Sequence, residues 1–341
     1  LLSHLSLAPM ALAEALLVPG LSDEEIQKKL LLSHAITRMG TQGWLFITPL
    51  VLLRFTPNSL AGPACWGAAT ELATSLLAPP LGSWADRTNR RFVVIIGVVG
   101  QGVGVVGATV VLLFALGGHE RSNLPAVCAF ICCSVVEQLG TTLSDVTVKR
   151  DWSPRLFSID LLRSTNSLMS QIDLISKTVA PLLAGLLIAP RFGVDAEVVG
   201  FVAVGVLNAL SFVPQLRLLL QIFAARSEQL SSVRGAPDGT TAVPPVPTLK
   251  STKFWAAKAA AWRAWYGHPS GIQFLSLAYA FLYVTVLSPH GALLTGYLYQ
   301  QGVPTWKLSL FRGAGALLGV LGVVAHPVLA RAFGRMADAL S

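Results

Sequence analysis

The sequence predicts an all-α membrane protein, a bundle of about eight long apolar helices. Only 12% of its 341 residues are charged and 53% are hydrophobic, whereas about 25% charged residues is usual in a soluble domain. The mean hydropathy is +0.63. Apolar stretches also recur along the chain, each bounded by charges, Pro or Gly, and each close to the roughly 20 residues that a helix needs to span a bilayer.

The predicted spans follow one another with short polar segments between most of them. They cover about residues 31–56, 60–84, 92–117, 124–147, 158–189, 197–222, 272–299 and 308–331. Before the first span, Ser22 and Glu25 have the spacing of a capping box, which predicts that a helix begins there.

Four parts of the chain follow from this pattern. They are an N-terminal segment with the start of a helix (1–30), a six-helix transmembrane half (31–222), an inner linker with an interfacial helix (223–268) and the first two helices of a second half (269–335). Six spans, a long inner loop and then further spans is the plan of transporters built from two six-helix halves.

The formal net charge of +8 would suggest nucleic-acid binding in a soluble protein. Here most Lys and Arg residues fall in segments that lie on one side when the spans alternate, as the positive-inside rule requires. We therefore expect an integral multi-pass membrane protein with membrane lipid as a partner, no nucleic-acid partner and a monomeric state. The helix expected at 253–267 carries three Trp residues beside basic ones, which is typical of a helix in the membrane interface.

Polar side chains inside apolar spans are candidate functional groups because the bilayer makes them costly. Glu71 and Glu137 are single carboxylates in the second and fourth spans, and either suits a proton or a cation as well as a structural hydrogen bond. Gln101 lies in the glycine-rich third span, where it needs a partner or a cavity. His290 lies in the seventh span, and a single histidine is more often structural than metal-ligating, since ligation needs several converging groups.

The fifth span is the richest in polar residues. Asp173 and Lys177 are four residues apart on one helix face and can pair, as can Asp160 and Arg163. Asn166 lies between these pairs. Two interpretations stay open: self-paired charges with polar contacts between helices, or the lining of a polar cavity.

The sequence from Gly82 to Arg91, GSWADRTNRR, resembles the inner-loop signature of the major facilitator superfamily. Asp86, Arg87, Arg90 and Arg91 are therefore candidate gating residues, whose charge pairs would hold the inner gate closed. A plain basic turn on the inner side is the alternative. The chain contains no nucleophile with a base, phosphate loop or metal-ligand triplet, so we predict no enzyme activity and no resident cofactor.

Three further motifs resemble ferroportins, the iron exporters of the solute carrier class. They are Lys149-Arg150-Asp151-Trp152 after the fourth span, RSTNSLMSQIDLISKTVAPLLAG in the fifth, and YGHPSGIQFLSLAYAFLYVTVLSPHGALLTGYLYQQG around the seventh. The resemblance runs from about residue 31 to 335. It implies a twelve-helix fold of the major facilitator type with rocking halves, of which this chain holds eight helices, and Fe(II) or Co(II) as exported cargo. Arg150 and Asp151 join Asp173 and Lys177 as gating candidates.

The resemblance also assigns individual positions. Gln101 matches the glutamine that the family links to metal and to a regulatory Ca(II), and Asn166 matches its fifth-span asparagine. Thr41 and Leu45 occupy the positions of the family's aspartate and histidine ligands in the first span. The family's seventh-span cysteine is also absent, and His290 stands close enough to its position to be a substitute.

The segment Leu287–Thr295 is closer to plastid-type plant and algal members. The resemblance thus implies a plastid envelope, or otherwise a plasma or vacuolar membrane. Because the first-span ligands are missing, a metal chelate or an organic cation of the polyamine or aminoglycoside kind is an alternative cargo. A non-transporting receptor or scaffold is a third hypothesis.

Overall fold

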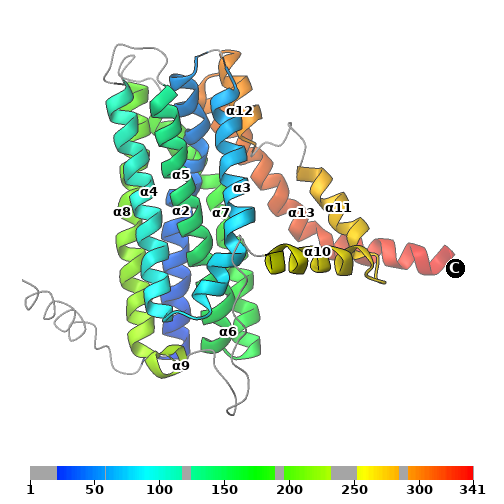
Figure 1. Ribbon diagram of the computed structural model, residues 1–341. Coiled ribbons are helices and arrows are strands. Elements are labelled where there is room, and N and C mark those ends of the chain that lie inside the picture. Colours follow the sequence, from blue (N-terminus) through cyan, green and yellow to red (C-terminus); the bar gives the residue numbers. More distant parts are fainter. Residues whose placement is uncertain are drawn as a thin grey trace, which may run out of the picture.

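Six long helices stand side by side in one bundle and correspond to the six predicted spans of the first half (Figure 1). They are α2 (Asp23–Phe55), α3 (Ala61–Ala85), α4 (Arg90–Leu116), α5 (Leu124–Asp145), α7 (Ile159–Ile188) and α8 (Ala196–Ala225). This computed structural model describes residues 21–57, 59–116, 124–188, 196–231, 252–283 and 291–340. The segment 1–20, most of the predicted linker and His290 lie outside the described residues.

Short elements gather at one end of the bundle. The π-helix η1 (Val146–Trp152) continues α5 and leads into α6 (Ser153–Leu156), while α9 (Ser227–Ser231) follows α8. Figure 1 shows α6 and α9 at the same end. We call it the inner end, because it carries the basic segments of the sequence.

The interfacial helix expected at 253–267 corresponds to α10 (Thr252–Tyr266). The second half is described by α11 (Ile272–Tyr283), α12 (Ala292–Gln300) and α13 (Thr305–Leu340). α12 packs on α2 and α3 at the outer end, and α13 packs on α7. The far part of α13 then runs away from the bundle, on the same side as α10 and α11 (Figure 1).

The prediction of one continuous seventh span at 272–299 is wrong. The structure describes two helices there, α11 and α12. Gly291 is the N-cap of α12 and has extended backbone angles, φ −72° and ψ 136°, which a continuous helix cannot contain. The eighth predicted span corresponds to α13, which is longer than expected.

The capping box at the start of α2 is confirmed. The Glu25 backbone N–H donates to Ser22 Oγ at 3.3 Å, and the Ser22 backbone N–H donates to Glu25 Oε2 at 2.8 Å. These hydrogen bonds satisfy two donors that a helix start otherwise leaves open. The bond from the Ser22 backbone holds the pKa of Glu25 below its ordinary value.

Four helical stretches of the described chain are long and apolar enough to cross a membrane by length and composition. They are Arg90–Ala115, Leu124–Leu156, Ile159–Ile188 and Glu197–Ala225. α2 is long too, but it buries polar side chains inside the bundle, among them Ser33, His34, Thr37, Thr41 and Thr48. The polar side chains of α2 therefore face the interior of the bundle rather than lipid.

Glycines let α4 and α5 approach closely. A Cβ on Gly104 would lie 2.5 Å from the Glu137 backbone nitrogen, and a Cβ on Gly140 would lie 2.6 Å from the Gln101 backbone nitrogen. Contacts this short against backbone cannot be relieved by rotating a side chain. The two helices thus depend on having hydrogen alone at these positions, as is common for packed helices in membranes.

We expect Gly140→Ala and Gly104→Ala each to destabilise the protein by about 1–3 kcal/mol, because the added methyl group forces α4 and α5 apart. Gly67→Ala is the matched control, since, apart from the backbone of α3 itself, no described atom lies within 4 Å of a Cβ at that position. Thermal unfolding of the purified variants in detergent measures the effect. Equal stability of the Gly140 and Gly67 variants would contradict this packing.

Candidate functional site

Asp173 of α7 is the centre of a group of charges near the inner end. Its Oδ1 lies 2.8 Å from His34 Nε2 and 3.0 Å from Arg38 Nε, and its Oδ2 lies 3.3 Å from Lys149 Nζ. The Asp173 side chain is 29% exposed. One carboxylate therefore joins three basic side chains from two other elements of the bundle, α2 and η1.

A second carboxylate completes this group. Asp145, the last residue of α5, forms an ion pair with Arg38 and lies 3.9 Å from Lys149 Nζ. We call His34, Arg38, Asp145, Lys149 and Asp173 the inner charge cluster. Its two carboxylates match its two permanent cations, so the cluster is electrically balanced when His34 is neutral.

The predicted pairing of Asp173 with Lys177 is wrong. Lys177 is exposed on α7, while Asp173 pairs with side chains from α2 and η1, because those helices bring cations against its buried face. The predicted pairing of Asp160 with Arg163 is confirmed at 3.7 Å, and these side chains are 97% and 78% exposed. That pair is therefore a surface contact.

A narrow polar cavity adjoins the inner charge cluster. It is lined by Thr37, Gln101, Thr141, Gln215 and members of the cluster, with apolar residues such as Leu30 and Leu219. Gln101 is 1% exposed, and its Nε2 donates to the Gly140 carbonyl at 3.4 Å. Within the described residues, neither Gln101 Oε1 nor Gln215 Oε1 has a hydrogen-bond partner. Buried acceptors of this kind are costly unless something donates to them or is coordinated by them.

The other predicted binding residues are not all at this cavity. Thr41 is buried on α2, and its Oγ1 has no hydrogen-bond partner among the described residues. Glu137 is buried on α5 and accepts from Thr141 Oγ1 at 3.1 Å. Glu71 and Asn166 are exposed on α3 and α7. The structure thus brings Gln101 to the polar cavity and leaves Glu71 and Asn166 on the outside of the described helices.

A second cluster involves the predicted gating motifs. Arg90 Nε lies 2.5 Å from Asp151 Oδ2, and Arg90 Nη1 donates to the Leu230 carbonyl at 3.0 Å. Arg155 Nε donates to Asp151 Oδ1 at 3.1 Å. Trp152 is buried beside Phe223 of α8, with ring centroids 5.9 Å apart. Arg90 therefore links α4 to η1 and α9. The KRDW motif supplies Asp151 as the partner of Arg90 and Trp152 as a buried aromatic contact with α8.

Most of the predicted gating residues share one surface. A cavity of about 270 Å³ is lined by Asp86, Arg90, Arg150 and Asp151, together with Gly82 and residues of η1 and α4. Arg87 is exposed in the same turn, and Arg91 is partly buried at the start of α4. The two signatures, far apart in the sequence, thus meet at the inner end.

Sequence reasoning missed His34, Arg38 and Asp145 as site residues. His34 and Arg38 are four residues apart within the predicted first span, and Thr37 and Thr41 lie on neighbouring turns. This polar face at helical spacing was a signal for them. Asp145 gave no such signal, because it lies at the end of a span where a charge is ordinary.

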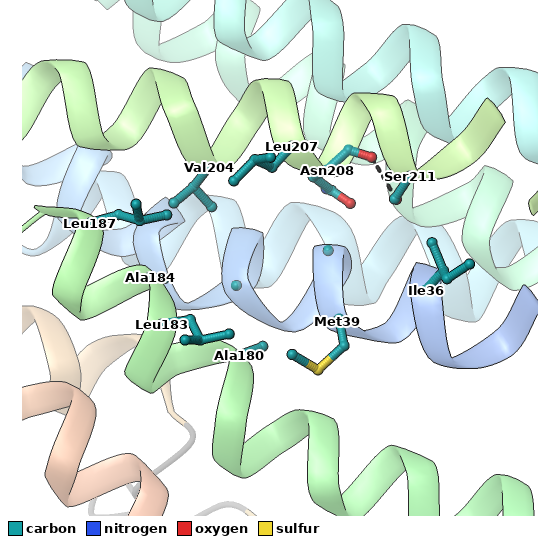
Figure 2. A pocket seen from close by; sticks show the side chains of 12 residues that line it. Ile36, Met39, Ala180, Leu183, Ala184, Leu187, Val204, Leu207, Asn208 and Ser211 are labelled. Atoms are coloured by element: carbon teal, nitrogen blue, oxygen red, sulfur yellow. Dashed lines mark hydrogen bonds between the residues drawn. The ribbon is translucent and has the colours of Figure 1, made fainter. Parts of the chain in front are cut away.

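An apolar groove lies elsewhere, between α2, α7 and α8 (Figure 2). Its volume is about 230 Å³, and its lining is apolar apart from Asn208 and Ser211. Figure 2 shows Leu183, Ala184 and Leu187 of α7 facing Val204 of α8 across it. Its lining carries no charged side chain.

The helical bundle, the start of a second half and the charge clusters at the inner end define a class: a secondary membrane transporter with a fold of the major facilitator type. A solved bacterial homologue of the iron transporter ferroportin in an inward-facing state aligns with a TM-score of 0.72 and 30% identity, over 92% of this chain and 70% of that one. A structure of a bacterial homologue of ferroportin in an outward-facing state with soaked iron aligns with a TM-score of 0.62.

The sequence comparisons give the family. The Ferroportin1 (FPN1) family model matches residues 24–340. The ferreportin of Bdellovibrio bacteriovorus is 32% identical over 91% of this chain and 68% of its own length. Solute carrier family 40 member 1 of Oryza sativa is 27% identical, over 90% of this chain and 66% of its own length. The chain belongs to the ferroportin family, which is a family of membrane transporters and not of enzymes, and it spans about two thirds of the length of these relatives.

We expect Asp173→Asn to lower the free energy of unfolding by roughly 2 kcal/mol, since Arg38 and Lys149 keep their partly buried charges without that carboxylate. Asp160→Asn is the matched control on the same helix. Its exposed pair with Arg163 is worth at most about 1 kcal/mol. Thermal unfolding in detergent measures both variants, and equal losses would contradict a special role for the inner charge cluster.

Proposed function

We propose that the protein containing this chain exports Fe(II) or a similar divalent metal cation by alternating access. One observation carries the proposal: the chain belongs to the ferroportin family and is similar to structures of a bacterial homologue in both inward-facing and outward-facing states. Two states of one related fold are what a rocking mechanism requires.

The clusters at the inner end have a mechanical part in this proposal. The described contacts of Arg90, Asp151 and Asp173 join helices of the same half. They therefore keep the inner ends of α2, α4, α7 and η1 together while that half moves against the other. Breaking such half-buried charge pairs is costly, so the six-helix half moves as one body.

The candidate ligand residues in the described part of the chain are less acidic than those that usually bind a divalent cation. No group of three or more His, Cys, Asp or Glu side chains in the described part of the chain is placed to hold a metal ion. Thr41 supplies only a neutral hydroxyl, and the carboxylates next to the polar cavity are already paired with Arg38 and Lys149. Ca(II) needs several oxygen ligands, usually including carboxylates. These residues do not fit the regulatory Ca(II) that the resemblance implies.

A second cargo has support from the same observation. A metal chelate or an organic cation brings its own ligands or its own charge, so it does not need a carboxylate at position 41. Neutral acceptors such as Thr41 Oγ1, Gln101 Oε1 and Gln215 Oε1 suit N–H or O–H donors of such a molecule.

Transport is tested with the protein in proteoliposomes. We expect protein-dependent flux of radioactive Fe(II) or Co(II), because membership of the family predicts metal cargo. The matched control is the same preparation with Gly140→Leu, which disrupts the contact of α4 with α5. Flux equal to that of empty vesicles would overturn the proposal and favour a receptor or scaffold.

The two cargo hypotheses are separated by restoring ligands. If the native cargo is a bare cation, Thr41→Asp with Leu45→His should raise the apparent affinity for Co(II) roughly ten-fold or more, because a carboxylate and an imidazole are better ligands than a hydroxyl and a methyl group. Competition with a polyamine measures the alternative. Metal flux that appears only in the double variant would favour the chelate or organic cation.

The membrane is a further part of the proposal. We infer a plastid envelope from the seventh-span segment Leu287–Thr295, with the plasma and vacuolar membranes as alternatives. The bacterial relative is more similar to the chain than the rice relative, at 32% against 27% identity, so the plastid assignment rests on this segment alone. A fluorescent fusion of the protein in cells of its source organism tests it, and signal in the plasma or vacuolar membrane would overturn it.

A further inference from the structure

Glu197, at the start of α8, joins three elements at the outer end. It forms an ion pair with Arg54, which lies near the end of α2. The hydroxyl of Tyr299 on α12 donates to Glu197 Oε1 at 2.7 Å. We call Arg54, Glu197 and Tyr299 the outer triad. Two of its members belong to the six-helix half, and the third belongs to the second half.

The outer triad is one of several contacts between the halves on this side. Arg312 of α13 is buried, with its guanidinium carbon 5.4 Å from the centroid of the Phe46 ring on α2. Ser309 of α13 approaches Gly185 of α7 so closely that a Cβ on Gly185 would lie 2.6 Å from Ser309 Cβ. α12 and the first part of α13 are thus held against the six-helix half.

The opposite end is arranged differently. The far part of α13 runs away from the bundle, on the same side of the view as α10 and α11 (Figure 1). The alignment with the inward-facing homologue is also better than with the outward-facing one, with TM-scores of 0.72 and 0.62. The structure therefore has the two halves together at the outer end, as an inward-facing transporter does.

We propose that Glu197 is an outer-gate residue, whose hydrogen bond from Tyr299 must break each time the protein opens outward. This inference rests on the proposed function, because it assigns a step of alternating access. The Arg54–Glu197 ion pair lies inside one half and persists when the halves separate. Only the neutral Tyr299 hydroxyl is withdrawn from the outer triad, so opening breaks one hydrogen bond of the triad and leaves Glu197 paired with Arg54.

Keeping the ion pair within one half and placing only a hydrogen bond between the halves lowers the cost of opening. Separating a charged pair in a partly dry interface costs more free energy than breaking a hydrogen bond between a neutral and a charged group. A gate that opens in every transport cycle works better with the contact that takes less free energy to break. The charge on Glu197 strengthens the bond that Tyr299 donates, and Arg54 keeps that charge in place during opening.

The test measures conformation without any cargo. Spin labels are attached at Leu124→Cys on α5 and Gln301→Cys next to α12, in protein whose native cysteines are replaced, and the distance between them is measured by pulsed electron resonance. Leu124 is 72% exposed and Gln301 is exposed. Tyr299→Phe should raise the ratio of long, outward-open distances to short ones about ten-fold, the value of one hydrogen bond to a charged group.

Tyr297→Phe is the matched control, since Tyr297 lies two residues earlier on the same helix and is exposed. We expect it to leave the distances unchanged. In protein that already carries Glu197→Ala, adding Tyr299→Phe should cause no further shift of the distances, because both substitutions remove the same contact. Unchanged distances in Tyr299→Phe protein that is monodisperse would overturn the inference. Because no metal is used, this result is independent of whether the cargo is Fe(II).

Discussion

The structure depends on how charges are kept paired inside a bundle that lipid surrounds. Asp173 accepts contacts from His34, Arg38 and Lys149, and these come from elements far apart in the sequence. An unpaired charge at this depth would be costly, so α2, α7 and η1 can approach only in a register that brings the partners together. The same condition at Arg90 and Asp151 fixes α4 against η1 and α9. Glycines at positions 104 and 140 let the backbones of α4 and α5 approach closely in the same bundle.

Much of the fold could be predicted from the sequence, because lipid makes apolar length a direct signal. The six spans of the first half correspond to α2, α3, α4, α5, α7 and α8, and the capping box at Ser22 is formed as expected. The end of helical structure before α12 was missed because the apolar stretches on both sides of it were taken as one span. Pro289 and Gly291 were the available signals in the sequence, and Gly291 has an extended backbone.

The candidate site was harder to predict, for a reason that can be seen at Asp173. Helical spacing suggested Lys177 as its partner, since residues four apart share a face. The structure pairs Asp173 with other helices, because partners from α2 and η1 lie on its buried side while Lys177 is exposed. Spacing within one helix shows which residues share a face, but not which helix covers that face. Gln101, in contrast, was expected to meet a partner or a cavity because a glycine-rich span leaves little room for an amide, and the structure has it donating to the Gly140 carbonyl and lining the polar cavity.

The central claim is that a protein of the ferroportin family carries a metal cation across the membrane by exposing one site alternately to each side. Counterflow tests this most directly, because it requires exchange of cargo through both states. Vesicles containing the protein are loaded with unlabelled Co(II) and placed in a trace of radioactive Co(II). Alternating access predicts a transient accumulation of label above its equilibrium level. Label that enters no faster than into protein-free vesicles, with the protein folded and inserted, would contradict it.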